Sequence, residues 1–129
     1  MAYALLQGMK STRGAISPVL AERGLHPGQD LMLSALWRED GITQAELAAR
    51  LGIEAPTVSR ALQRSERAGY VRREAGRGRS RRVYLTEEGQ ALRRPVEQAW
   101  RNADRRLRRR IGPDDLAALR RILGRLTSS

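Results

Sequence analysis

The chain has 129 residues, which is enough for one compact domain with a single core, and its formal net charge at pH 7 is +11. This excess of positive charge favours a polyanionic partner, nucleic acid before membrane. The absence of cysteine excludes disulfides, thiol redox sensing and thiolate metal sites. No apolar run approaches the roughly 18 residues of a membrane span, so we expect a cytoplasmic protein with no signal peptide and no membrane contact.

The first 42 residues carry no net charge, and their apolar pattern predicts two helices. Apolar side chains recur at roughly helical spacing over residues 3–22, and Pro18 is expected to kink or break that helix. The sequence His26-Pro27-Gly28 predicts a turn and the start of a second amphipathic helix, which ends near residues 40–41.

A helix-turn-helix pattern follows. Thr43 and Glu46 have the spacing of a capping box, so a short helix begins there and Gly52 closes it. Residues 52–54 are then a turn before a helix over about 55–68, which carries proline near its start, where proline is tolerated.

A basic hairpin is predicted after that helix. Residues 70–73 and 81–85 alternate like strands around a glycine-rich tip, residues 74–80. Residues 43–85 hold ten arginines against four glutamates, a net charge of +6, compared with +5 for residues 86–129. The middle third is therefore the predicted polyanion-binding face.

The last third is predicted to be helical. A long helix starts at Thr86, with a bend expected at Pro95, and a final helix starts near Pro113 with acidic residues in its first turn. The final helix has a 3-4-3 leucine seam, and so short a chain offers little surface to cover it, which favours a dimer interface over an intramolecular core. The seam consists of Leu116, Leu119, Leu123 and Leu126.

The helix over residues 55–68 has two different faces at about 100° per residue. One face is apolar, and the other carries side chains that pair with base edges in a major groove: arginine with guanine O6 and N7, glutamine with adenine N6 and N7. The predicted base-reading residues are Arg60, Gln63, Arg64 and Arg67. A polar face on a single helix is more often just solvated. The capped helix before it and the hairpin after it make DNA reading the better interpretation.

Phosphate contacts are predicted around this face. Thr43, Thr57 and Ser59 lie near helix starts, where hydroxyl groups and free amides suit phosphate oxygens. The hairpin strands contribute Arg72, Arg73, Arg81 and Arg82, for which solvated charges on an edge strand are the alternative reading. At the tip, Arg77 and Arg79 are the candidates for a narrow minor groove.

The ordered series of segments resembles the MarR family of winged helix-turn-helix regulators. The resemblance is carried by residues 25–29, 41–53, 57–60, 66–71 and 85–89, which include Leu85-Thr86-Glu87-Glu88-Gly89. One departure lies in the wing, where the family commonly has an aspartate followed two residues later by an arginine. Here Arg77 takes the place of the aspartate, so Arg79 lacks its usual partner, and Glu74 is a candidate substitute.

This resemblance implies a mainly α fold with a small β-hairpin wing. It implies a winged helix-turn-helix over residues 25–86 within one continuous domain, and N- and C-terminal dimerisation helices over residues 1–24 and 87–129. A homodimer would place two recognition helices in major grooves and two wings in minor grooves of a pseudo-palindromic double-stranded DNA operator, with half-sites about 10 base pairs apart. The resemblance then implies a transcriptional regulator, with a repressor favoured over an activator.

Many relatives bind a small aromatic or anionic effector, and Tyr3, Met32, Trp37 and Trp100 are the candidates to line its cleft. Aromatic and methionine side chains at helical spacing are more often plain core, so both readings stay open. With one histidine and no cysteine, no metal is predicted, and no cofactor.

Three other classes remain to be weighed. A winged-helix protein that coats or bends DNA, in an architectural or replication-associated role without sensing, would show a steep salt dependence and little preference for a palindrome. An RNA-binding or ribosome-associated domain would need exposed aromatic side chains for stacking, and the basic face has none. An enzyme is disfavoured because no triad, carboxylate pair, metal cluster or phosphate loop is recognisable.

Overall fold

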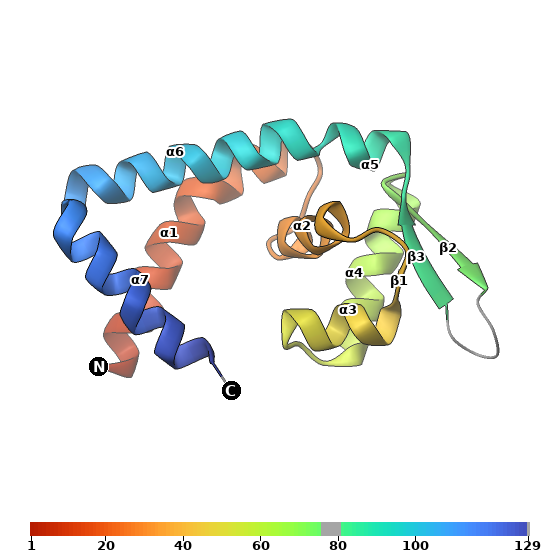
Figure 1. Ribbon diagram of the computed structural model, residues 1–129. Helices are drawn as coiled ribbons and strands as arrows, with labels where there is room; N and C mark the ends of the chain where they lie inside the picture. The colour runs from red at the N-terminus through yellow and green to blue at the C-terminus, as the bar shows by residue number, and fades with distance from the viewer. Residues whose placement is uncertain (76–80, 129) are drawn as a thin grey trace. The chain divides into compact units, whose positions relative to one another are not determined.

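The computed structural model describes residues 1–75 and 81–128, which form a mainly helical protein with a small antiparallel sheet (Figure 1). This confirms the predicted fold class. The elements in chain order are α1 (Ala2–Glu22), α2 (Gln29–Arg38), β1 (Ile42–Thr43), α3 (Gln44–Leu51), α4 (Ala55–Arg67), β2 (Val71–Ala75), β3 (Arg81–Leu85), α5 (Glu87–Ala91), α6 (Arg93–Ile111) and α7 (Pro113–Thr127).

The chain divides into two compact units. The helical unit consists of Met1–Ile16 and Gln98–Ser129, and the winged-helix unit consists of Ser17–Glu97. Both α1 and α6 begin in one unit and end in the other.

The sheet of the winged-helix unit has the strand order β1-β3-β2, with both neighbouring pairs antiparallel. Val71 pairs with Leu85 and Arg73 with Val83, so β2 and β3 form the hairpin that the sequence predicts. Strand β1 is not predicted from the sequence. It is two residues long, too short for an alternating pattern, and it exists because Ile42 is buried where it pairs with Val83.

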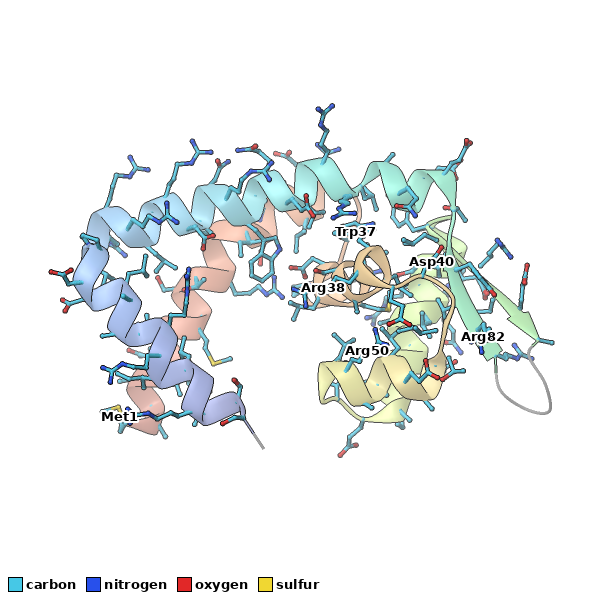
Figure 2. The ribbon with its side chains drawn as sticks, viewed as in Figure 1. Met1, Trp37, Arg38, Asp40, Arg50 and Arg82 are labelled. Atoms are coloured by element: carbon cyan, nitrogen blue, oxygen red, sulfur yellow. The ribbon has the colours of Figure 1, made fainter. Side chains whose placement is uncertain are left out.

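The core of the winged-helix unit lies between the sheet and helices α2 to α4. Polar contacts tie its parts together. Trp37 of α2 donates its indole N–H to the carbonyl of Gly89 at 3.0 Å (Figure 2), and Asp40 accepts the backbone N–H of Leu85 at 2.9 Å. The buried apolar side chains of this unit are Leu20, Leu25, Met32, Leu33, Leu36, Ile42, Leu47, Val58, Leu62, Val71, Val83, Leu85, Leu92 and Val96.

The helical unit buries much less. Its buried apolar side chains among the described residues are Ile16, Ala99 and Ala103, while large apolar side chains of α1 and α7 stay exposed. Leu6 is 62% and Leu126 is 64% exposed. This unit taken alone therefore has little hydrophobic core.

Proline acts differently in the two long helices. Helix α1 continues through Pro18, so the expected break is absent; Ile16 and Leu20 on either side are fully buried, and that burial offsets the lost hydrogen bond. Before Pro95, in contrast, the helix is interrupted at Leu92, between α5 and α6. A proline ring crowds the carbonyl four residues earlier, here that of Ala91.

Gly89 lies where α5 meets the start of β2. A Cβ atom at this position would overlap the carbonyl oxygen of Tyr70, which accepts the backbone N–H of Thr86 at 3.0 Å. Thr86 in turn accepts the N–H of Gly89 at 3.1 Å and donates to the carbonyl of Gly69 at 2.5 Å. The contact needs a residue without a side chain, which gives a physical reason for glycine in the Leu85–Gly89 segment.

We therefore expect Gly89→Ala to lower the melting temperature, because the methyl group must push α5 away from Tyr70 and weaken the Trp37 and Thr86 hydrogen bonds. Gly14→Ala in α1 is the matched control: beyond the adjoining residues and helix backbone, no atom of the described residues lies within 4 Å of the added methyl, and alanine is the better helix former. Thermal unfolding followed by circular dichroism compares the two. Equal melting temperatures for both variants would contradict the close approach.

Candidate nucleic-acid interface

Helix α3 begins with the capping box that the sequence predicts. The hydroxyl of Thr43 accepts the N–H of Glu46 at 3.1 Å, and the Glu46 carboxylate accepts the N–H of Thr43 at 3.4 Å. The helix ends at Gly52, whose φ of 64° is left-handed and suits glycine. The Thr43 hydroxyl retains acceptor capacity, so its predicted phosphate contact stays a prediction.

Helix α4 follows after a turn at residues 52–54. Its N-cap residue, Glu54, makes no side-chain hydrogen bond to the helix end, and Pro56 lies in the first turn. Thr57 at this end is exposed and Ser59 is half-buried. The positive end of the helix dipole and the Thr57 hydroxyl therefore face outward together, an arrangement that suits a phosphate group.

One face of α4 is fully buried, which fixes the orientation of the other face. Val58, Leu62 and Ser65 have no exposed surface, and Ala61 is half-buried. The buried Ser65 hydroxyl accepts a hydrogen bond from the Gln29 amide at 2.8 Å, and the Gln29 carbonyl accepts the N–H of His26 at 2.6 Å. This polar chain joins α4 to α2 and leaves no buried polar atom of Gln29 or Ser65 without a partner.

The outward face carries the four predicted base-reading side chains. Arg60, Gln63, Arg64 and Arg67 are all exposed, and within the described part of the chain none of the three arginines makes an ion pair. The structure brings these four together on one helix, as the sequence indicates. Their guanidinium groups are free to bind an external anion.

The strands of the wing use their arginines in a different way. Arg72 forms an ion pair with Glu74 and lies over the ring of Tyr84, with its guanidinium carbon 4.6 Å from the ring centre. Arg82 donates to the carbonyl of Gly41 at 2.7 Å (Figure 2), while Arg81 is exposed. Phosphate contacts by these residues stay predictions. A guanidinium has five N–H donors, so a partner within the protein leaves some donors for a phosphate.

Arg73 is held most firmly. Its Nε and Nη2 atoms each donate to a carboxylate oxygen of Glu66 at 3.1 Å, and its side chain is only 14% exposed. The hydrogen bonds and positive charge of Arg73 hold the pKa of Glu66 below its ordinary value, against a smaller opposing effect of burial. This two-point contact ties the last turn of α4 to β2. Sequence reasoning assigned Arg73 to phosphate and missed Glu66, because no local spacing rule pairs a helix end with a following strand.

The tip of the wing, including the predicted minor-groove residues Arg77 and Arg79, lies outside the described residues. Glu74 was the candidate partner for Arg79, and the structure pairs it with Arg72.

The four candidates for an effector cleft belong to different units. Met32 is buried in the core and Trp37 is half-buried in the winged-helix unit, whereas Tyr3 and Trp100 are exposed in the helical unit. The predicted cleft therefore stays a prediction.

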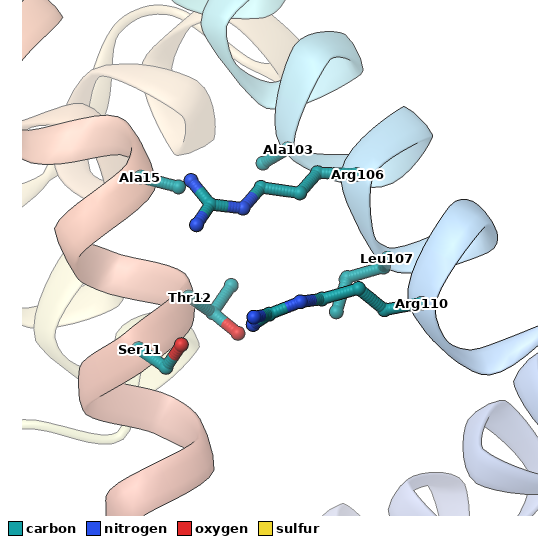
Figure 3. Close-up of a pocket in the computed structure, with 7 residues that line it drawn as sticks. All are labelled: Ser11, Thr12, Ala15, Ala103, Arg106, Leu107 and Arg110. Atoms are coloured by element: carbon teal, nitrogen blue, oxygen red, sulfur yellow. The ribbon is translucent and has the colours of Figure 1, made fainter.

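Within the helical unit, a small cavity of about 30 Å³ lies between α1 and α6 (Figure 3). That volume is close to the share of one water molecule and far below that of ordinary ligand pockets. Two arginines reach across it toward α1. The lining residues are Ser11, Thr12, Ala15, Ala103, Arg106, Leu107 and Arg110.

No helix within the described residues is both long and apolar enough to cross a membrane. The same residues contain no cluster of three histidine or acidic side chains that could bind a metal ion.

These elements define a winged helix-turn-helix protein. A capped helix and a turn lead into a second helix with one buried and one basic face, and an antiparallel wing follows. Comparison with known proteins gives its family. The sequence profile of the MarR family matches residues 19–82. The HTH-type transcriptional repressor Rv2887 of Mycobacterium tuberculosis is 30% identical over an alignment of 130 positions, gaps included. The alignment covers 99% of this chain and 94% of that protein. The regulator TtmR of Methylorubrum extorquens is 36% identical over 80 residues, 60% of this chain and 41% of TtmR.

Solved structures agree. A MarR transcriptional regulator from Methanosarcina mazei Go1 superposes with a TM-score of 0.87 at 28% identity, over 97% of this chain and 85% of that one. Rv2887 in complex with DNA superposes with a TM-score of 0.76 at 27% identity, over 99% of this chain and 98% of that one. The chain belongs to the MarR family of helix-turn-helix transcriptional regulators. This confirms the resemblance seen in the sequence and the expectation that the chain is not an enzyme.

The Glu66–Arg73 pair predicts a specific dependence of stability on pH. Because the folded-state pKa of Glu66 is lowered, its contribution is present above the ordinary value of 4.5 and is lost as the pH falls through and below that value. We expect Glu66→Gln to melt at a lower temperature than the wild type near pH 7 and to show a smaller decline on acidification. An exposed pair contributes about 1 kcal/mol or less, so the difference is a few degrees.

Glu54→Gln is the matched control, since Glu54 is exposed and makes no cap hydrogen bond. Its melting temperature near pH 7 should lie closer to the wild type than that of Glu66→Gln, because this carboxylate acts on α4 only through the helix dipole and has no ion-pair partner within the described residues. The assignment fails if Glu66→Gln and Glu54→Gln give the same profile.

Proposed function

We propose that this protein is a sequence-specific double-stranded DNA-binding transcriptional regulator, acting as a repressor, with α4 in the major groove and the wing in the adjacent minor groove. The observation that carries the proposal is the outward face of α4, where Arg60, Arg64 and Arg67 are exposed and without acidic partners within the described residues. The family gives support, since the relative Rv2887 is named a repressor and has been crystallised with DNA.

The chemistry of the face fits base reading better than phosphate binding alone. Three arginines suit guanine edges and Gln63 suits adenine, while the N-terminal end of α4 with Thr57 suits the backbone that borders the groove. The wing would add Arg77 and Arg79 in the minor groove. The proposal also includes an effector: a small aromatic or anionic molecule that binds the protein and relieves repression.

The proposal includes a homodimer on a pseudo-palindromic operator. The supporting observation is the apolar surface of the helical unit, where Tyr3, Leu6, Met9, Ile122 and Leu126 are exposed although the unit has little core of its own. Several exposed large apolar side chains on the helices of one small unit favour a partner surface, and a second copy of the chain offers a self-complementary one. Residues 25–86 would then bind DNA, and the helices over residues 1–24 and 87–129 would form the dimer.

If α4 reads bases, removal of one of its arginines should cost more binding free energy on the operator than on unrelated duplex DNA. We expect Arg60→Ala or Arg64→Ala to lose roughly 1–3 kcal/mol of binding free energy on an operator selected from a random duplex pool, and less on unrelated duplex. The measurement is a fluorescence-anisotropy titration on both duplexes at one salt concentration. Equal losses on both would instead favour the architectural, non-sensing alternative.

The dimer is tested on the last helix. Leu123→Glu combined with Leu126→Glu puts charge into the leucine seam of α7, so we expect the wild-type chain to sediment as a dimer and this variant as a monomer. The control is Arg121→Glu with Arg125→Glu, which places the same new side chains on the polar side of α7 and should leave the dimer intact. A leucine variant with the wild-type mass would remove α7 from the interface.

A further inference from the structure

Most of the net positive charge of this chain lies outside the winged-helix unit. The helical unit holds eleven basic side chains against three acidic ones, a net charge of +8 in Met1–Ile16 and Gln98–Ser129. The winged-helix unit holds fourteen against eleven, a net charge of +3 in Ser17–Glu97. The difference in net charge between the two units is not visible along the sequence, because the helical unit is formed by segments from opposite ends of the chain.

Much of the excess is on one side of α6. Ala99 and Ala103 are buried, and at about 100° per residue Arg101, Arg105 and Arg108 lie on the opposite side of the helix. We call these three exposed residues the basic stripe. They follow one another by one helical turn, about 5.4 Å along the axis, and Figure 2 shows side chains tipped with nitrogen along α6.

Neutral groups hold two of the three stripe arginines in place without cancelling their charge. Arg101 donates to the side-chain carbonyl of Gln98 at 3.0 Å, and Arg105 donates to that of Asn102 at 3.0 Å. The Gln98 amide also donates to Asn102 at 3.0 Å. In contrast, Arg93 at the start of α6 forms an ion pair with Glu97 at 2.9 Å. Asp104, the acidic residue closest to the stripe along the helix, forms no ion pair within the described part of the chain.

We propose that the basic stripe is a second DNA-binding surface, which contacts the phosphates of double-stranded DNA without reading bases. The three arginines span about 10.5 Å of the helix axis. Each strand of double-stranded DNA carries about three phosphates over that length, since it has one negative charge per about 3.4 Å. Arginine forks bind phosphate oxygens at two points. The surface goes beyond the proposed operator contact, because it belongs to the unit that lacks the helix-turn-helix.

Other polyanions fit the stripe less well. A membrane-surface helix needs an apolar face to enter the lipid, and here Ala99 and Ala103 are already buried. Single-stranded RNA is held by stacking on aromatic side chains, and the stripe has none. Duplex DNA is also the polyanion that the winged-helix unit would bring into reach at high effective concentration, and this part of the argument rests on the proposed function.

The test compares two triple variants of the full chain. The stripe variant carries Arg101→Gln, Arg105→Gln and Arg108→Gln. The control carries Lys10→Gln, Arg121→Gln and Arg125→Gln, three exposed residues of the same helical unit, so both lose three charges from that unit. Circular dichroism and sedimentation establish that both keep the helicity and mass of the wild type; a stripe variant that fails here is replaced by the single variants, which are measured in the same way.

The readout is the salt dependence of binding to a long random-sequence duplex. Each lost phosphate contact makes the slope of log K against log salt shallower by about 0.9, so we expect the stripe variant to lose about 2–3 in slope and the control to lose less than 1. Equal slopes for the stripe variant and the wild type overturn the proposal. Equal losses in the two variants overturn it as well, because they indicate net charge rather than the stripe.

Two further arms identify the DNA that is bound. A loss seen on a long duplex but absent on one that just spans the operator supports contact with flanking DNA. In a bridging assay, the protein captures a labelled duplex on a duplex that is attached to beads. A loss of this capture in the stripe variant supports contact with a second DNA molecule. The proposal is overturned if the stripe variant loses binding to phosphatidylserine vesicles or to single-stranded RNA while duplex binding is unchanged.

The two proposals fail separately. Arg60→Gln with Arg64→Gln alters α4 and leaves the stripe intact, so an unchanged preference for the selected operator in that variant would refute base reading alone. The salt slope on random-sequence duplex reports the stripe whatever the outcome for α4.

Discussion

The complete burial of one face of α4 is the constraint from which the candidate interface follows. Val58, Leu62 and Ser65 are inaccessible, and the Gln29–Ser65 hydrogen bond of 2.8 Å adds a directional contact to the apolar packing. A helix fixed in this way cannot rotate about its own axis without exposing apolar surface and breaking a buried hydrogen bond. Arg60, Arg64 and Arg67 are therefore directed outward by the packing on the other side of the helix.

The structure contains two kinds of arginine. In the wing, Arg72 and Arg73 are paired with Glu74 and Glu66, and Arg82 is bound to the carbonyl of Gly41. On α4 and along the basic stripe of α6, the guanidinium groups have no acidic partner within the described residues. The first kind joins secondary-structure elements to one another, and the second kind carries charge that remains available to a polyanion. Formal net charge alone does not separate them.

Features decided by neighbours in the sequence could be predicted, and features decided by distant contacts could not. The Thr43–Glu46 capping box and the two faces of α4 depend on spacings of three and four residues, and both were found from the sequence. The passage of α1 through Pro18 goes with the burial of Ile16 and Leu20, so of the two outcomes that the local rule allows, a kink or a break, the break does not occur. The Glu66–Arg73 pair and the fit of Gly89 against Tyr70 also join separate elements. For the same reason the charge of the helical unit became visible only after its two segments were grouped.

The two-point contact between Arg73 and Glu66 has a mechanical consequence for the proposed complex. Because it joins the last turn of α4 to β2, it favours one orientation of the proposed reading helix relative to the base of the wing, and turning either one alone breaks the contact. A duplex whose grooves do not match the fixed spacing must itself twist or bend to fit. Stiff and flexible base steps differ in the energy that such distortion requires, so the operator would be selected partly at positions that no side chain touches.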